Sequence, residues 1–158
     1  MTHRVLIVED EILIALDLSS IIQEMGHEVV AVAADSDAAR AAVERPGGLD
    51  LALVDLNLQD GPSGPALGRD LARRGITVLH LTANPRQVSL GVEGPIGILP
   101  KPYTERSLRD AVTFALAMRA GRPLPVPDGL RILPRPAEVA GGAERPRRHA
   151  GPALHAVA

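Results

Sequence analysis

Short apolar runs alternate with longer segments of helical periodicity over the first 120 residues, and this alternation limits the fold more than any other feature. Continuous aliphatic runs are typical of strands buried on both faces. We expect five strands, at Arg4–Val8, Glu28–Ala34, Leu51–Val54, Ile76–Leu81 and Pro95–Leu99. Strands that alternate with helices form parallel sheets covered on both sides. The sequence therefore predicts an α/β fold with a doubly wound parallel sheet.

Helical spacing and terminal signals predict the segments between these strands. The expected helices run over Glu11–Met25, Asp37–Glu44, Pro65–Arg73 and Glu105–Arg119. Gly26 stands where a C-terminal glycine cap belongs, and Ser36 and Thr104 are the expected N-caps. The fourth connection, Asn84–Gly94, contains a proline and two glycines. A short or irregular helix is therefore expected there.

Composition changes after residue 120. The last 38 residues contain 7 prolines and 5 glycines, which oppose regular structure. We expect a domain over 1–120 and a mostly unstructured tail over 121–158. One stretch of the tail, LPVPDGLRILP (Leu124–Pro134), has enough apolar residues to dock on the domain or on a partner. The basic RPRRH cluster at Arg145–His149 is interpreted as solvated, so nucleic acid is not an expected partner.

Composition also excludes several classes of protein. The chain is 46% hydrophobic and 23% charged, as soluble domains are, and it has no cysteine for disulfides or thiolate-bound zinc. The apolar run Val5–Val8 is too short for a signal peptide, and no apolar run is long enough to cross a membrane. We expect a cytoplasmic protein. The sequence contains neither the GxxxxGK[ST] nor the GxGxxG phosphate-loop pattern.

Polar residues stand at the predicted carboxyl ends of four strands. These are Glu9 and Asp10 after the first, Asp55 after the third, Thr82 and Ala83 after the fourth, and Lys101 between two prolines after the fifth. Parallel α/β sheets build their sites outside these ends. Each residue alone has an ordinary explanation, such as a helix cap or a solvated charge, so the prediction rests on the set. Lys101 is the only lysine among 17 basic residues.

The chemistry of this set points to phosphoryl transfer. Clustered carboxylates repel one another unless a cation joins them. Oxygen ligands without histidine or cysteine suit Mg²⁺. Asp55 is then a candidate nucleophile, since carboxylates form aspartyl-phosphates. The metal, the Thr82 hydroxyl and the Lys101 ammonium would stabilise the phosphoryl oxygens.

Four segments carry a family resemblance, and they span most of the first 120 residues. They are VLIVEDE (Val5–Glu11), LALVDLNLQDGPSG (Leu51–Gly64), VLHLTAN (Val78–Asn84) and LPKPY (Leu99–Tyr103). In order and spacing they resemble the receiver domain of two-component response regulators. The resemblance implies a flavodoxin-like, five-stranded parallel sheet with strand order 2-1-3-4-5.

The resemblance also implies roles for the acidic residues. Asp55 would be the phosphoacceptor and a ligand of Mg²⁺. Asp10 would bind the metal directly and Glu9 through water. The backbone carbonyl of Asn57 would be the third protein ligand.

Five further residues would bind the phosphoryl group or respond to it. Thr82 matches the switch hydroxyl, Lys101 the phosphoryl-binding lysine and Tyr103 the aromatic residue that changes position on activation. Ala83 and Pro102 would support them. The resemblance further suggests that the Lys101–Pro102 peptide is cis.

The implied function is that of a single-domain response regulator. A histidine kinase or phosphotransfer protein would be the phosphodonor, and an unknown downstream protein would receive the signal by contact. The chain would not be an enzyme beyond catalysing its own phosphorylation and dephosphorylation, and would be a monomer or a weak phosphorylation-dependent dimer. The stretch NPRQVSLGVEGP resembles a subgroup of alphaproteobacterial receivers paired with HWE-type histidine kinases, some of them in general stress signalling.

Two alternatives remain open at this point. A phosphatase of the haloacid dehalogenase type also uses an aspartate nucleophile and Mg²⁺, but it normally has a second aspartate where Asn57 stands. A pseudo-receiver, which binds partners without taking phosphate, is the other. Turnover of a phosphomonoester would favour the phosphatase, whereas the intact set from Glu9 to Lys101 argues against the pseudo-receiver.

Overall fold

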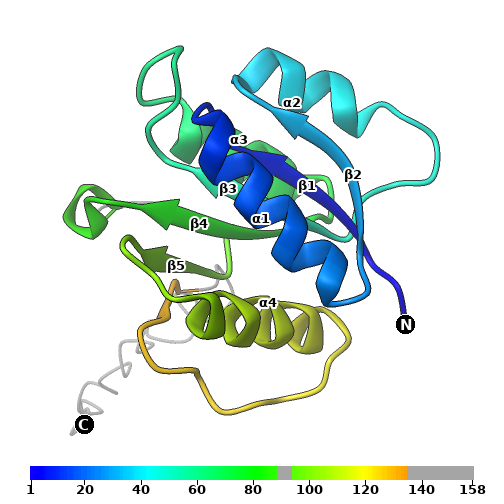
Figure 1. Cartoon of the computed structure of the whole chain (residues 1–158), viewed down its shortest axis with the longest axis vertical. Coiled ribbons are helices and arrows are strands. Elements are labelled where there is room, and N and C mark those ends of the chain that lie inside the picture. The colour runs from blue at the N-terminus through cyan, green and yellow to red at the C-terminus, as the bar shows by residue number, and fades with distance from the viewer. Residues whose placement is uncertain (89–93, 135–158) are drawn as a thin grey trace, which may run out of the picture.

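The computed structural model describes residues 1–88 and 94–134, in which strands and helices alternate (Figure 1). The elements are β1 (Arg4–Val8), α1 (Ile12–Glu24), β2 (Glu28–Ala33), α2 (Ser36–Val43), β3 (Leu51–Asp55), α3 (Gly64–Arg73), β4 (Thr77–Thr82), the 3₁₀ helix η1 (Pro85–Val88), β5 (Gly97–Pro100), α4 (Glu105–Arg119) and β6 (Arg131–Ile132).

These strands form one sheet in the order β2-β1-β3-β4-β5-β6. Neighbouring strands from β2 to β5 pair in parallel, which confirms the predicted order 2-1-3-4-5. The predicted number of strands is wrong by one, because β6 adds an antiparallel edge beside β5. The sheet is therefore six-stranded and mixed.

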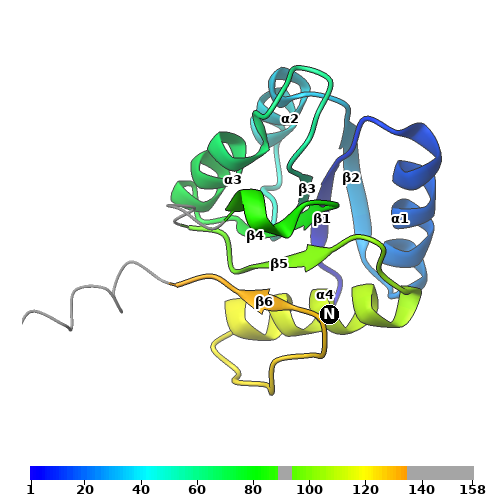
Figure 2. The ribbon, with the colours of Figure 1, turned by 90° about the vertical axis from the view of Figure 1, so that its left-hand side faces the viewer.

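Helices cover both faces of the sheet, as Figure 2 shows. One core cluster packs α1 and α4 against the sheet and includes Leu18, Leu53, Leu81 and Val112. A second cluster packs α2 and α3 against the opposite face. Burying one such aliphatic side chain contributes about 1.5–3 kcal/mol, so the two clusters hold the strands in register.

The helix ends follow the expected physical signals with one exception. Thr104 accepts the backbone N–H of Ser107 and forms a capping box at the start of α4. Gly26 follows α1 with φ 85°, a conformation that glycine adopts at low cost. The exception is α2, which begins at Ser36 and is capped by the carboxylate of Asp35. Aspartate and serine are both favourable N-cap residues, so the sequence alone did not show which of the two adjacent residues caps the helix.

The connection between β4 and β5 lacks a regular helix in its described part. Only the single 3₁₀ turn η1 is present, in keeping with the predicted short or irregular helix. Residues 89–93 lie outside the described residues. Across 1–88 and 94–134, no helix is long and apolar enough to cross a membrane.

The first part of the predicted tail is structured, which corrects the expectation for Leu124–Pro134. Here β6 pairs with β5, and the side chain of Leu130 is buried in the larger core cluster. The stretch singled out for its apolar residues thus docks on the domain itself. The rest of the tail, including the Arg145–His149 cluster, lies outside the described residues.

Candidate functional site

Acidic side chains gather where β1 and β3 end. Glu9 directly follows β1, and Asp55 is the last residue of β3; they are 2% and 5% exposed. Carboxylate oxygens of Glu9, Asp10 and Asp55 all lie within 4.8 Å of one another. The register of the parallel strands brings these residues together, since β1 and β3 pair from Val5–Leu51 to Val8–Val54.

Lys101, which comes from the end of β5, contacts this acidic cluster. It follows β5, and its Nζ lies 2.8 Å from Oδ2 of Asp55 and 3.2 Å from Oε2 of Glu9. Its backbone N–H donates to the carbonyl of Thr82 at 2.7 Å, which fixes the start of the turn. The Lys101–Pro102 peptide is cis, as expected. One ammonium therefore bridges the ends of three strands.

Burial and mutual repulsion shape the charges of this cluster. The pKa of Glu9 is raised to about 7, chiefly by burial and also by the charge of Asp55, while the N–H of Glu11 and the ammonium of Lys101 oppose this shift. Burial works against the charge of Lys101, but hydrogen bonds and ion pairs with Asp55 and Glu9 outweigh it and raise the lysine pKa. The site thus favours additional positive charge.

The residues of this cluster fit Mg²⁺. Three carboxylates offer hard oxygen ligands at short mutual distances, and the cluster includes no histidine and no cysteine. A divalent cation would relieve the repulsion among these carboxylates and offset the cost of their burial. Asn57 is two residues after Asp55, and its backbone N–H donates to Oδ1 of Asp55 at 2.9 Å.

The two residues at the end of β4, Thr82 and Ala83, differ in burial. Thr82 is fully buried, and its hydroxyl oxygen accepts the backbone N–H of Asn84 at 3.0 Å. Ala83 is exposed. Thr82 pairs with Pro100 of β5, so it lies one strand away from Asp55 at the same edge of the sheet.

Tyr103 borders a shallow pocket beside the acidic cluster. The ring packs partly buried against the core on the α1 side, and burial raises its pKa to about 12. The pocket has a volume of about 420 Å³ and is lined by Leu13, Ile14, Asp17, Lys101, Pro102 and Tyr103. Next to it, the first turns of α1 expose three large apolar side chains, of Ile12, Leu13 and Leu16. The sequence interpretation missed these side chains as a surface feature.

His80 was also missed, although it lies close to the site. This β4 residue is fully buried; its Nδ1–H donates to the carbonyl of Val54 at 3.2 Å, and its Nε2 has no hydrogen-bond partner. Burial lowers its pKa to about 4, so the ring is neutral near pH 7. Gly68 of α3 makes room for it, since an added Cβ there would lie 2.5 Å from the ring. The sequence signal was a histidine within an apolar strand, and this signal did not reveal its contact with Gly68.

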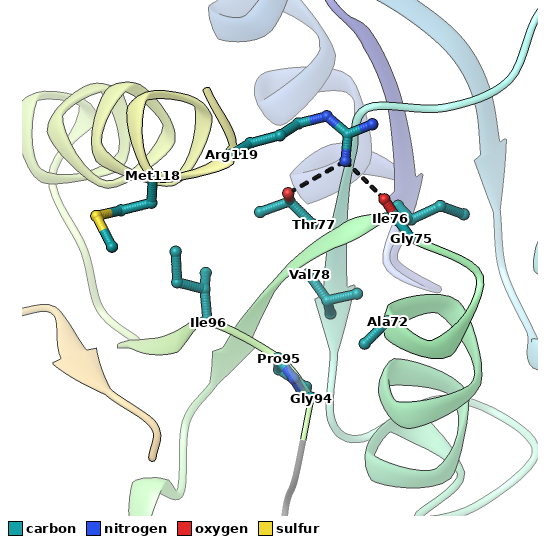
Figure 3. A pocket seen from close by; sticks show the side chains of 10 residues that line it. All are labelled: Ala72, Gly75, Ile76, Thr77, Val78, Gly94, Pro95, Ile96, Met118 and Arg119. Carbon is teal, nitrogen blue, oxygen red and sulfur yellow. Dashed lines mark hydrogen bonds between the residues drawn. The ribbon is translucent and has the colours of Figure 1, made fainter. Parts of the chain in front are cut away.

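A second hollow lies at the opposite end of the sheet and is shown in Figure 3. It has a volume of about 220 Å³ between the ends of α3 and α4 and the starts of β4 and β5. The guanidinium of Arg119 donates to the carbonyl of Gly75 at 2.6 Å and lies 3.5 Å from Asp50. Because this cation is already engaged by the protein and the amino ends of the strands meet here, the hollow is not the predicted site.

The doubly wound sheet and the acidic cluster at its carboxyl edge are the arrangement expected of a receiver domain. The family model of the response regulator receiver domain matches residues 5–113, and the chain therefore belongs to this family. Receiver domains bind Mg²⁺ at an acidic pocket, and this chain has an acidic cluster of Glu9, Asp10 and Asp55 at the carboxyl edge of its sheet.

Similar proteins support this assignment. The Phyllosphere-induced regulator PhyR of Methylorubrum extorquens is 35% identical over 121 residues, 73% of this chain and 44% of that protein. The transcriptional regulatory protein PdtaR of Mycobacterium tuberculosis is 30% identical over 120 residues, 73% of this chain and 57% of that protein. The chain thus spans about half the length of these two relatives.

Solved structures show the same fold. The receiver domain of PhyR from Erythrobacter litoralis matches with a TM-score of 0.69 at 31% identity, over 79% of this chain and 97% of that domain. A CheY-like receiver from Methanospirillum hungatei matches with a TM-score of 0.67 at 26% identity, over 77% of this chain and 98% of that one. Family membership removes the basis for the phosphatase alternative, because these relatives are receivers.

Proposed function

We propose that this chain is a response regulator that accepts a phosphoryl group on Asp55 in a two-component phosphorelay. The observation that carries the proposal is the contact of Asp55 with Lys101 inside a cluster of three carboxylates. One carboxylate oxygen of Asp55 attacks the phosphorus of a phosphohistidine. The new P–O bond forms as the P–N bond breaks, and the electron pair stays with the imidazole, which then takes up a proton.

Each group of the site has a task in this transfer. Glu9, Asp10, Asp55 and the carbonyl of Asn57 would hold Mg²⁺, which supplies charge stabilisation to the phosphoryl oxygens. The ammonium of Lys101 is a compact charge that would pair with the phosphoryl oxygens during the transfer. The N–H of Asn57 keeps the carboxylate of Asp55 oriented at 2.9 Å. After transfer, the hydroxyl of Thr82 turns from the Asn84 N–H toward the phosphoryl group, and Tyr103 moves with it.

The test is the intact mass of the protein after incubation with acetyl phosphate or phosphoramidate and Mg²⁺. We expect a gain of one phosphoryl group that base removes, as it removes acyl phosphates. Asp55→Ala should take up none. Asp37→Ala is the matched control, because the carboxylate of Asp37 is fully exposed on α2. A stable adduct on Asp55→Ala contradicts the proposal, and the absence of any adduct on the wild-type chain favours a pseudo-receiver.

The metal part of the proposal has its own test. Asp10→Ala removes a carboxylate whose oxygen lies within 4.8 Å of those of Glu9 and Asp55. Calorimetric titration with Mg²⁺ should show at least about tenfold weaker binding, the range that loss of a ligand or its support produces. Undiminished affinity in the folded variant would place the metal elsewhere.

The partner that donates phosphate is proposed to dock on the start of α1. Leu13 is 78% exposed beside the Tyr103 pocket, so the phosphoacceptor is flanked by an apolar surface. Leu13→Ser should slow transfer from a phosphorylated histidine phosphotransfer domain and leave uptake from acetyl phosphate unchanged. Leu124→Ser is the control, because this exposed side chain lies near Met25, at the other end of α1. Equal slowing in both variants would rule out α1 as the docking surface.

Signalling by protein contact is supported by the relatives. One similar structure is that of the anti-anti-sigma factor PhyR of Bartonella quintana, at 30% identity over 76% of this chain. Another is the PhyR stress response regulator, at 33% identity. These similarities support the expected subgroup of alphaproteobacterial receivers, with a histidine kinase upstream and a protein downstream.

A further inference from the structure

The C-terminal strap, defined as Leu124–Pro134, folds back along the β5 edge of the sheet (Figure 2). A turn closed by the Leu130 N–H and the Pro127 carbonyl at 3.2 Å reverses the chain, with Gly129 at φ 82°. Arg131 and Ile132 then pair antiparallel with β5. The strap ends as the N–H of Leu133 donates to the carbonyl of Ile96 at 3.0 Å.

Gly97 of β5 provides the space in which the strap docks. A Cβ added to Gly97 would lie 2.7 Å from the carbonyl oxygen of Arg131 and 3.3 Å from Cδ1 of Leu130. The side chain of Leu130 fills this space and is only 7% exposed. The absence of a side chain at position 97 is thus a requirement for docking.

The end of the strap packs on residues that are close in sequence to the proposed phosphorylation site. Leu133 packs on a small cluster formed by the buried side chains of Leu56 and Ile98. Leu56 is bonded directly to Asp55, and Ile98 belongs to the strand that leads into Lys101. The surface under Leu133 therefore consists of the residue that follows Asp55 and a residue of β5, the strand that precedes Lys101.

The docked strap is held by few contacts. Only two of its residues pair with β5, and Ile132 between Leu130 and Leu133 is 45% exposed. Pro125 and Pro127 have no backbone N–H to donate. A change in the positions of Leu56 and Ile98 would therefore alter the equilibrium between the docked and the released strap.

We propose that the strap is an intramolecular ligand of the β5 edge and that phosphorylation of Asp55 releases it. This inference rests on the proposed function. A phosphoryl group on Asp55 adds charge and volume next to Leu56 and draws Lys101, with the end of β5, toward itself. The fit of Leu133 to Leu56 and Ile98 is then lost, and the β5 edge becomes free to pair with another strand.

Amide hydrogen exchange of the full chain, with and without beryllofluoride and Mg²⁺, tests the release. Beryllofluoride serves as the phosphoryl analogue. We expect the N–H of Leu133 to exchange at least about fivefold faster in the bound state, the lower end of typical coupling between two sites. Unchanged or slower exchange of Leu133 overturns the inference.

Reciprocity supplies the second measurement. If bound phosphoryl analogue releases the strap, removal of the strap must strengthen analogue binding by the same factor. Gly97→Ala blocks docking from the β5 side, and Leu133→Ala removes the contact with Leu56. Both should bind beryllofluoride at least about fivefold more tightly than wild type. Val126→Ala is the matched control, because that strap side chain is 51% exposed.

The outcomes separate this inference from the proposed function. If acetyl phosphate modifies the wild-type chain but both strap variants bind the analogue with unchanged affinity, the strap is a static part of the fold and the inference is wrong. If neither acetyl phosphate nor beryllofluoride binds at Asp55 in any variant, the proposed function fails and the inference fails with it. Should Gly97→Ala not fold, Leu133→Ala alone decides.

Discussion

The ammonium of Lys101 lies 2.8 Å from Oδ2 of Asp55, and the same nitrogen lies 3.2 Å from Oε2 of Glu9. This single contact set joins β1, β3 and β5 through three largely buried charges. It is also the place where a phosphoryl group and Mg²⁺ would have to be accommodated. Two predictions follow from the size and the charge of the group at position 101.

Lys101→Arg should impair switching although it keeps the positive charge. The guanidinium is larger and planar, so it cannot reach the same oxygen atoms between Asp55 and Glu9 without displacing one of them. We expect uptake of phosphate at Asp55 to persist while the response of Thr82 and Tyr103 is lost. The measurement compares amide spectra with and without beryllofluoride. Ligand-induced shifts that match the wild type, including those at Tyr103, would contradict the prediction.

Lys101→Met should lower the stability of the metal-free protein. Removal of the ammonium leaves Glu9 and Asp55 without their shared cation, and we expect a loss of about 2–3 kcal/mol in the free energy of unfolding. Mg²⁺ should restore more stability to this variant than to the wild type, because it neutralises the same carboxylates. Urea unfolding with and without Mg²⁺ measures both. Arg106→Met is the control, since Arg106 is an exposed residue of α4.

His80 should make stability depend on pH in a defined window. Its pKa is 6.5 in the unfolded chain and about 4 in the folded protein, because burial disfavours the charged ring. The contribution of His80 to stability is fully present above about pH 6.5, where its ring is neutral in both the folded and the unfolded chain. This contribution decreases as the pH falls to 4, because the unfolded chain binds the proton more tightly than the folded protein does. The shift corresponds to about 3 kcal/mol.

The variant His80→Phe isolates this contribution from that of the carboxylates. It should lose less stability than the wild type between pH 6.5 and 4, as measured by urea unfolding at each pH. Replacement also removes the unpartnered Nε2, but it leaves the Val54 carbonyl without the imidazole donor. Parallel pH curves for the two proteins would show that the ring is not held neutral by burial.

Gly68→Ala should destabilise the packing of α3 on β4. The new methyl group would lie 2.5 Å from the imidazole of His80 and 3.2 Å from Cγ of Pro95. Overpacking of this kind costs about 1–3 kcal/mol, even though alanine favours a helix over glycine. In the background of His80→Ala the same substitution should be neutral or stabilising. Additive effects in this double-mutant cycle would refute the contact.

The sequence was sufficient to predict which residues meet at the carboxyl edge of the sheet, because periodicity and topology act together there. Once alternating strands and helices imply a parallel sheet, the residues after each strand must meet at one edge, and Glu9, Asp55 and Lys101 do so. The direct contact of Lys101 with both carboxylates is a finding of the structure, since the sequence assigned the lysine only to phosphoryl oxygens. The order of the first five strands was likewise implied by the family resemblance.

What the sequence did not reveal depends on contacts between distant segments. The two paired residues of β6 are too few to show strand periodicity, and they follow a proline-rich stretch that suggests disorder. Their docking requires the missing side chain at Gly97, a relation that spans 34 residues of sequence. The same holds for His80, whose burial depends on Gly68 of another element. Local patterns cannot report such complementarity.

The strap also bears on how copies of the protein behave toward one another. A parallel sheet of this kind has two open borders along which foreign strands can add. At one border the guanidinium of Arg45 donates to the carbonyl of Val30 in β2. At the other border, β6 pairs with β5, and β6 itself is only two residues long and lies shortly before Pro134. A chain that has lost the strap is thus expected to form oligomers at high concentration, in which the free β5 edge pairs with a strand of another copy. Solubility therefore reports whether the strap is docked.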